Sequence, residues 1–191
     1  MKDIIKNIID ESVLLKKKFI ENNTDLILEC ADQLAMCLTS GHKILLFGNG
    51  GSAADAQHIA AEFINRFKIE RQPLAAMALT TDTSVITSIG NDYSFDEIFI
   101  KQITALGRTG DMALGISTSG NSKNVVLAID KAKEIGMMTV VLTGHGGILA
   151  KKSDIVFRVE SDNTARIQEI HITLAHILCE LVERILYPEM F

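Results

Sequence analysis

The chain has 191 residues, of which 47% are hydrophobic and 23% are charged, and its formal net charge is −5. This length is enough for one domain with a substantial core, and we expect a single domain over residues 1–191. The acidic balance argues against a nucleic-acid partner, and the absence of an uncharged apolar run of about 18 residues argues against a membrane span.

The first forty residues have helical periodicity. Apolar side chains stripe one face of residues 3–22, beginning with Ile4, Ile5, Ile8 and Ile9. A second helical pattern covers residues 24–40, and the polar run Asn23-Thr24-Asp25 lies between the two. We therefore expect an N-terminal helical hairpin within residues 1–40.

Five short apolar runs follow in residues 41–191. They are Lys43–Phe47, Leu74–Leu79, Met112–Ile116, Thr139–Leu142 and Ile155–Val159. The runs are continuous rather than alternating, which is typical of strands buried on both faces. Helical patterns at about 53–67, 94–107 and 122–135 separate most of them. The alternation predicts an α/β fold: a three-layer αβα sandwich around a five-stranded, parallel, doubly wound sheet.

The last helical pattern runs from Thr164 to Leu186 and is apolar almost all round in its later half. Such a helix is usually buried on more than one side, and we expect part of this burial to lie in a subunit interface. Three sparse cysteines, Cys30, Cys37 and Cys179, lie in apolar helical contexts. Together with the lack of an apolar leader, they indicate reduced thiols in a cytoplasmic protein.

A glycine-rich turn, Gly48–Ser52, follows the first predicted strand and opens a helix. Backbone N–H groups at such a helix start can bind an anion. The third glycine of a dinucleotide fingerprint would fall at Ala53, and the Gly-Lys-Ser/Thr of a P-loop is missing. The turn therefore favours a small phosphate or a sugar hydroxyl over a nucleotide, and a tight turn without a ligand is the alternative.

A second loop, Ser117–Ser122, follows the third predicted strand and contains four hydroxyls and one glycine. At a helix start it can bind an anion without a cationic side chain, although such a loop can also be only a helix cap. Open α/β sheets bind ligands at the carboxyl ends of their strands, so two such loops favour a phosphate site.

His58 and Glu62 are four residues apart on the helix after the glycine-rich turn, so their side chains share one face. They could form a metal or acid/base pair, or an exposed ion pair. Gln168 and His176 lie on the last helix, eight residues and about 12 Å apart. Both could reach one site only at full stretch or from different subunits.

These motifs, with Asn91-Asp92 and Arg166–His171, resemble the phosphoheptose isomerase family of sugar isomerase (SIS) domain proteins over about residues 3–186. The resemblance implies conversion of sedoheptulose 7-phosphate to D-glycero-D-manno-heptose 7-phosphate. This is the first step toward activated heptoses for bacterial lipopolysaccharide or capsule. It also implies a homotetramer with active sites at subunit contacts.

The resemblance implies a role for each matching residue. Glu62 and His176 would be the catalytic base and acid. Zinc would be held by His58, Glu62, Gln168 and His176. The substrate would contact Asn49, Gly50, Gly51, Glu62, Asn91, Asp92, Ser117, Thr118, Ser119, Ser122 and Gln168, with the four hydroxyl residues on its phosphate.

Two departures leave an alternative open. Ala165 stands where some relatives have an acidic residue, and Ser52–Asp55 lacks the His and Cys that others have there. Both features also resemble a non-enzymatic SIS-domain protein that binds the bacterial replication initiator. That protein lacks counterparts of Glu62 and His176, which this chain has, so the sequence favours the isomerase.

Overall fold

The computed structural model covers residues 1–191. In chain order the elements are α1 (Lys2–Thr39), β1 (Ile44–Gly48), α2 (Gly51–Ile64), β2 (Ala76–Ala78), α3 (Thr83–Asp92), α4 (Ile98–Leu106), β3 (Met112–Ser117), α5 (Lys123–Ile135), β4 (Met138–Thr143), β5 (Ile155–Arg158) and α6 (Thr164–Leu186). Short 3₁₀ helices lie at η1 (Phe95–Glu97), η2 (Leu149–Lys151) and η3 (Pro188–Met190). All five strands lie within or beside the predicted apolar runs.

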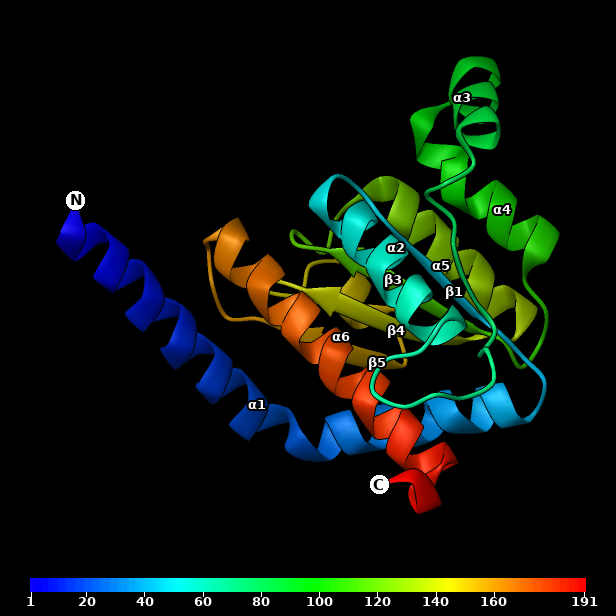
Figure 1. The fold of residues 1–191 in the computed structure, drawn as a ribbon. Helices are drawn as coiled ribbons and strands as arrows, with labels where there is room; N and C mark the ends of the chain where they lie inside the picture. Colours follow the sequence, from blue (N-terminus) through cyan, green and yellow to red (C-terminus); the bar gives the residue numbers. More distant parts are fainter.

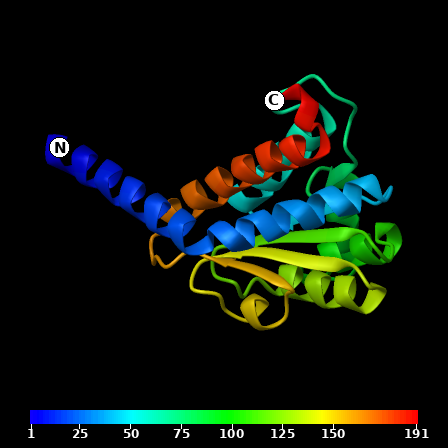
Figure 2. The same cartoon turned by 90° about the horizontal axis from the view of Figure 1, so that it is seen from below.

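The five strands form one parallel sheet in the order β2-β1-β3-β4-β5, which confirms the predicted doubly wound sheet. Figure 2 shows the sheet between two helical layers, with α1, α2 and α6 on one side and α5 on the other. The central strands β1 and β3 are buried along their whole length, whereas the edge strands β2 and β5 each expose one residue. Strands at the centre of the sheet are therefore buried on both faces, whereas the edge strands are buried only in part.

The N-terminal segment is one bent helix, so the predicted helical hairpin is wrong. α1 continues unbroken from Lys2 to Thr39, and it changes direction near its middle (Figure 1). There the Asn23 side chain donates a hydrogen bond to the Phe19 carbonyl at 2.7 Å, and the Thr24 hydroxyl donates one to the Ile20 carbonyl at 2.8 Å. Bonds of this kind bend a helix without ending it, so the polar residues that predicted a turn produce a bend.

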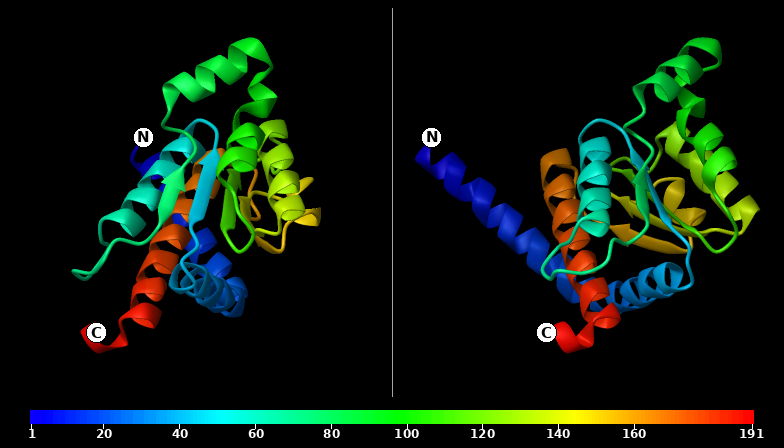
Figure 3. Two further views of the ribbon diagram at one scale, coloured as in Figure 1. Left: turned by 90° about the vertical axis from the view of Figure 1, so that its right-hand side faces the viewer. Right: turned by 45° about the vertical axis from the view of Figure 1, so that its right-hand side comes forward.

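The first half of α1 projects from the rest of the molecule (Figures 1 and 3). Its apolar side chains are between 44% and 92% exposed: Met1, Ile4, Ile5, Ile8, Ile9, Val13 and Leu14. Isolated exposed aliphatic residues are ordinary, but a contiguous stripe of them is typical of an interaction surface.

The sequence patterns missed α3. This helix begins after Asp82, whose carboxylate accepts a hydrogen bond from the Val85 amide at 2.9 Å. That capping aspartate is the signal from which the helix could have been predicted. α3 packs against η1 and α4 and stands away from the sheet (Figure 3), with Ile89 as its buried residue.

α6 has the predicted bounds, and part of its apolar surface is buried within the single chain. Leu174 and Leu178 are 0% and 3% exposed within the single chain, because α6 packs against α1 and α2. These two residues therefore belong to the chain's own core. Ile172, Ile177 and Leu181 stay partly exposed on α6, and the subunit contact expected for this helix remains a prediction. None of the helices combines the length and hydropathy needed to cross a bilayer.

Candidate active site

The two predicted ligand loops begin side by side at the carboxyl ends of the central strands. β1 and β3 are neighbours in register, with Gly48 opposite Ile116. The side-chain amides of Asn49 and Asn124 exchange two hydrogen bonds of 2.9 Å, which tie the glycine-rich turn to the first turn of α5. Sequence reasoning did not single out Asn124, although an Asn in the first turn of a helix beside a candidate ligand loop was a signal for it.

The hydroxyl loop presents its side chains at the N-terminus of α5. Ser122 is the N-cap residue, yet its hydroxyl makes no capping bond to the helix. It lies instead 2.9 Å from the Ser117 hydroxyl, which is 3.4 Å from that of Ser119. Three hydroxyls thus converge where the helix dipole favours an anion. Thr118 lies between them and fixes the loop, because its carbonyl accepts a bond from the Gly144 amide at 2.9 Å.

Gln168 lies over the start of α2. A side chain at Gly51 would overlap the end of the Gln168 side chain, which would then have to move aside. Gly50, the N-cap residue of α2, has φ +57°, a conformation that glycine adopts without strain. The turn and Gln168 therefore form one polar surface at the amino end of α2.

A second cluster lies farther along the same two helices. His58 Nε2 is 3.0 Å from Glu62 Oε1 and 3.3 Å from His176 Nε2. One donor atom from each of these residues lies within 4.8 Å of the other two. α2 and α6 pack together, and this contact brings His176 beside two residues more than 110 positions earlier in the chain.

No hydrogen bond joins Gln168 to this cluster. Gln168 touches Gly51, which precedes His58 by seven residues, or about 10 Å of helix. Asn91 and Asp92, at the end of α3, bond to one another through a 2.8 Å side-chain contact. The predicted site residues of one chain therefore form three groups: the two joined loops with Gln168, the His58–Glu62–His176 cluster, and the Asn91–Asp92 pair.

Burial sets the protonation of groups around the cluster. Burial raises the pKa of the Cys179 thiol to about 12, and the negative charges of Glu62 and Glu183 add to this shift. Without a metal, Cys179 is therefore a protonated thiol at neutral pH. Burial also raises the pKa of Asp55, against the opposing effect of His58. All three cysteines are free and buried, as predicted.

A further residue that the sequence analysis missed contacts the cluster. The Phe67 ring stacks on the His176 imidazole, with centroids 5.5 Å apart and planes inclined by 27°. Phe67 lies in the irregular segment between α2 and β2. In the sequence, Phe67 stands five residues after Glu62. That spacing gives no indication of a contact with His176, which lies on a different helix.

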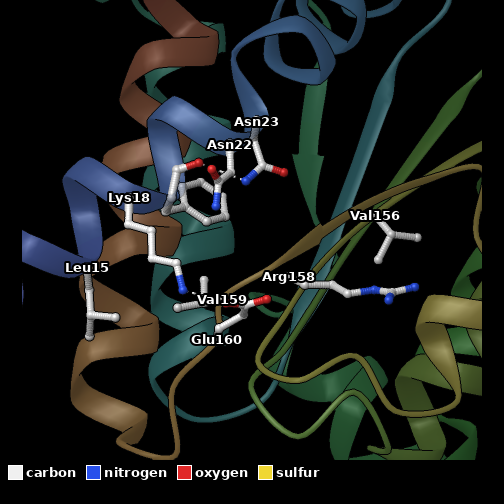
Figure 4. A pocket seen from close by; sticks show the side chains of 9 residues that line it. Leu15, Lys18, Asn22, Asn23, Val156, Arg158, Val159 and Glu160 are labelled. Atoms are coloured by element: carbon white, nitrogen blue, oxygen red, sulfur yellow. Dashed lines mark hydrogen bonds and ion pairs between the residues drawn. The ribbon is translucent and has the colours of Figure 1, made fainter.

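A small pocket lies away from all of these residues. It occupies about 220 Å³ between α1 and the segment around β5 (Figure 4). Its lining residues are Leu15, Lys18, Phe19, Asn22, Asn23, Val156, Arg158, Val159 and Glu160. Lys18 and Glu160 form an ion pair of 2.8 Å across it. Because it contains no predicted site residue, we do not assign it to the reaction.

The chain is similar to known proteins in both sequence and structure. Residues 9–144 match the SIS domain family. The chain is 56% identical to a phosphoheptose isomerase of Nitratidesulfovibrio vulgaris, over 94% of this chain and 87% of that protein. It is 53% identical to one of Aquifex aeolicus, over 96% of both chains.

Solved structures give the same result. A phosphoheptose isomerase from Neisseria gonorrhoeae superposes with a TM-score of 0.89 at 45% identity, over 95% of this chain and 98% of the other. One from Francisella tularensis superposes with a TM-score of 0.92 at 40% identity, over 95% and 97%. The chain therefore belongs to the SIS domain family and, within it, to the phosphoheptose isomerases.

Proposed function

We propose that this enzyme converts sedoheptulose 7-phosphate to D-glycero-D-manno-heptose 7-phosphate in the cytoplasm. This reaction is the first step in making activated heptose for a bacterial surface polysaccharide. The observation that carries the proposal is the contact of Glu62, His58 and His176 in a chain 56% identical to a phosphoheptose isomerase. We also infer that residues 1–191 form one SIS domain, with α1 followed by the α/β core.

The chemistry needs a base that moves a proton between two carbons. Glu62 removes a proton from C1 of the ketose, which gives an enediol, and returns it to C2. A second group protonates the oxygen at C2 and removes the proton from the oxygen at C1. His176 suits this role because imidazole can donate and accept protons near neutral pH. The 3.0 Å contact with His58 supports Glu62 by limiting the orientations of its carboxylate.

The two joined loops would bind the rest of the substrate. The hydroxyls of Ser117, Thr118, Ser119 and Ser122, with the first amides of α5, would hold the phosphate. The polar surface formed by Asn49, Gly50, Gly51 and Gln168, together with Asn91 and Asp92, would contact sugar hydroxyls. The support for this assignment is the convergence of three hydroxyls at a helix N-terminus, which binds anions without a cationic side chain.

The cluster also suits a zinc ion. Two imidazoles and one carboxylate are a common catalytic zinc donor set, and donors about 2 Å from a tetrahedral ion lie about 3.3 Å apart. The contacts of 3.0 and 3.3 Å around His58 fit this spacing. We propose that His58, Glu62 and His176 hold zinc, with Gln168 as the fourth predicted ligand. When bound, the ion would polarise the carbonyl and stabilise negative charge on oxygen.

We propose a homotetramer whose active sites lie at subunit contacts. Within one chain the two loops, the cluster and the Asn91–Asp92 pair remain separate groups, and a second copy could bring them together. The exposed apolar stripe on the first half of α1 supports this assembly, because it needs a partner to cover it. Gln168 would then join a cluster of another copy more easily than its own.

The test is an isomerase assay on sedoheptulose 7-phosphate, followed by NMR, before and after removal of metal with a chelator. We expect activity that is lost on chelation and restored by added zinc. Activity that survives complete metal removal would refute the zinc proposal alone. No turnover by the zinc-loaded protein, together with binding of the bacterial replication initiator, would favour the non-enzymatic alternative.

A further inference from the structure

A buried ion pair lies behind the proposed active site. The Arg71 and Glu183 side chains are each 1% exposed, and Arg71 Nε donates to Glu183 Oε1 at 2.9 Å. Arg71 belongs to the irregular segment 65–75 between α2 and β2, and Glu183 belongs to α6. Charges buried to this degree are stable only when every polar atom has a partner. The hydrogen-bond partners of Arg71 and Glu183 therefore show which parts of the chain this pair holds in place.

Glu183 holds the backbone of the irregular segment. Its carboxylate accepts hydrogen bonds from three successive amides, those of Phe67, Lys68 and Ile69, at 2.9, 2.8 and 3.3 Å. With Arg71, this makes four donors on two carboxylate oxygens. Three consecutive amides directed at one buried group fix the path of the chain at Phe67 without any regular secondary structure.

Arg71 holds the carboxyl end of α2. Its guanidinium donates to the carbonyls of Glu62 and Phe63, both at 2.9 Å, and to that of Gln72 at 3.1 Å. The last carbonyls of a helix have no partner within the helix, and α2 has no basic residue in its own last turn. Arg71 therefore supplies this cap from outside the helix, on the residue that we assign as the base.

The two halves of this network meet at the acid and the base. Glu183 sets the position of Phe67, whose ring stacks on the His176 imidazole. Arg71 binds the Glu62 carbonyl directly. Arg71 contacts the backbone of Glu62 and not its carboxylate, so the link from this network to a reacting side chain runs through the Phe67 ring.

We propose that Phe67 is a positioning residue for the isomerisation, and that the Arg71–Glu183 pair holds it against His176. The Phe67 ring restricts the rotation of the imidazole, so that His176 faces His58 and Glu62. This inference rests on the proposed function and deepens it, because it identifies what orients the proposed acid. Phe67 touches neither substrate nor reacting atoms in this role.

The first test compares two substitutions at one position. Phe67→Leu keeps an apolar side chain but removes the aromatic face, whereas Phe67→Tyr keeps the face. We expect kcat to fall about tenfold in Phe67→Leu, the upper effect of one aromatic pair, with KM within about twofold. Phe67→Tyr should retain wild-type kcat. A matched control is Phe157→Leu, which removes a fully buried ring on β5 and should lower the melting temperature without a specific loss of kcat.

A second readout does not depend on turnover. In protein labelled with ¹³C at histidine Cε1, the stacked ring should shift the His176 signal, which His176→Gln identifies. We expect the signal to move in Phe67→Leu and to stay in place in Phe67→Tyr. An unmoved signal in Phe67→Leu would overturn the stacking itself. A moved signal with wild-type kcat would overturn the positioning role alone.

The third test addresses the ion pair. Arg71→Lys keeps the charge but cannot match the forked contacts of arginine, and we expect a fall in kcat similar to that of Phe67→Leu. If Arg71 acts through Phe67, the double variant should be little slower than either single variant. Fully additive losses would overturn that link. Absence of turnover in the zinc-loaded wild type, by contrast, would refute the proposed function.

Discussion

Replacing Glu62 by glutamine should remove the proposed base, which is also a proposed zinc ligand, and keep the fold around it. Glutamine has nearly the same shape, and its amide can keep the hydrogen bond that joins Glu62 Oε1 to His58 Nε2 at 3.0 Å. The Glu62 carbonyl, which accepts a bond from Arg71 at 2.9 Å, is unchanged. We therefore expect Glu62→Gln to fold and assemble as the wild type does.

The magnitude of the catalytic loss follows from the role of the carboxylate. General base catalysis contributes about 10²–10⁴-fold, which corresponds to about 3–5 kcal/mol of transition-state stabilisation. The side chain of Glu62 is 25% exposed, so water can reach the site but is a far weaker base than a carboxylate. We expect kcat to fall at least a hundredfold. KM should change less, because the hydroxyl loop is untouched.

The assay follows turnover of sedoheptulose 7-phosphate by NMR at saturating zinc, in H₂O and in D₂O. In D₂O the wild type should exchange the transferred hydrogen with solvent, and Glu62→Gln should not. Glu70→Gln is the matched control, because that carboxylate is 88% exposed and pairs with Arg66; it should keep full activity. A Glu62→Gln enzyme that retains more than a tenth of wild-type kcat would refute the assignment of Glu62 as the base.

Three further predictions concern binding and stability. Ser119→Ala and Ser122→Ala should each raise KM by about 10- to 100-fold, because a hydrogen bond to a charged group is worth about 1.5–3 kcal/mol; wild-type KM in both would place the phosphate elsewhere. Leu178→Ala should lower the free energy of unfolding by about 2–5 kcal/mol, because Leu178 is only 3% exposed and lies in the core. Denaturant unfolding at several protein concentrations measures this loss. Dissociation of the oligomer without a loss of subunit stability would contradict the prediction. Burial lowers the pKa of His171 to about 4, so below its ordinary pKa near 6.5 the unfolded chain binds a proton that the folded chain does not. Stability should therefore fall by about 3 kcal/mol between pH 6.5 and pH 4; His171→Leu should lack this part of the loss, and parallel pH curves for the two proteins would contradict it.

The sequence by itself determined the parts of the protein that depend on local pattern. Continuous apolar runs identified all five strands, because strands buried between two helical layers have no polar face. Periodicity gave α6 its bounds, and the four-residue spacing put His58 and Glu62 on one face of α2. The capping signal at Asp82 was also present, although the patterns used did not include it.

Only the tertiary structure decided which distant residues meet. The packing of α6 on α2 placed His176 3.3 Å from His58, and it placed Gln168 over Gly51 instead. No periodicity encodes such contacts, because they depend on how two helices lie on a sheet. The sequence also did not show that α1 is continuous. The side chains of Asn23 and Thr24 donate hydrogen bonds to carbonyls of the preceding turn, and the helix bends there instead of ending. The Arg71–Glu183 pair joins residues that are 112 positions apart in the chain. The sequence does not distinguish these two charged residues from ordinary surface groups, because only the folded structure shows that they are buried together.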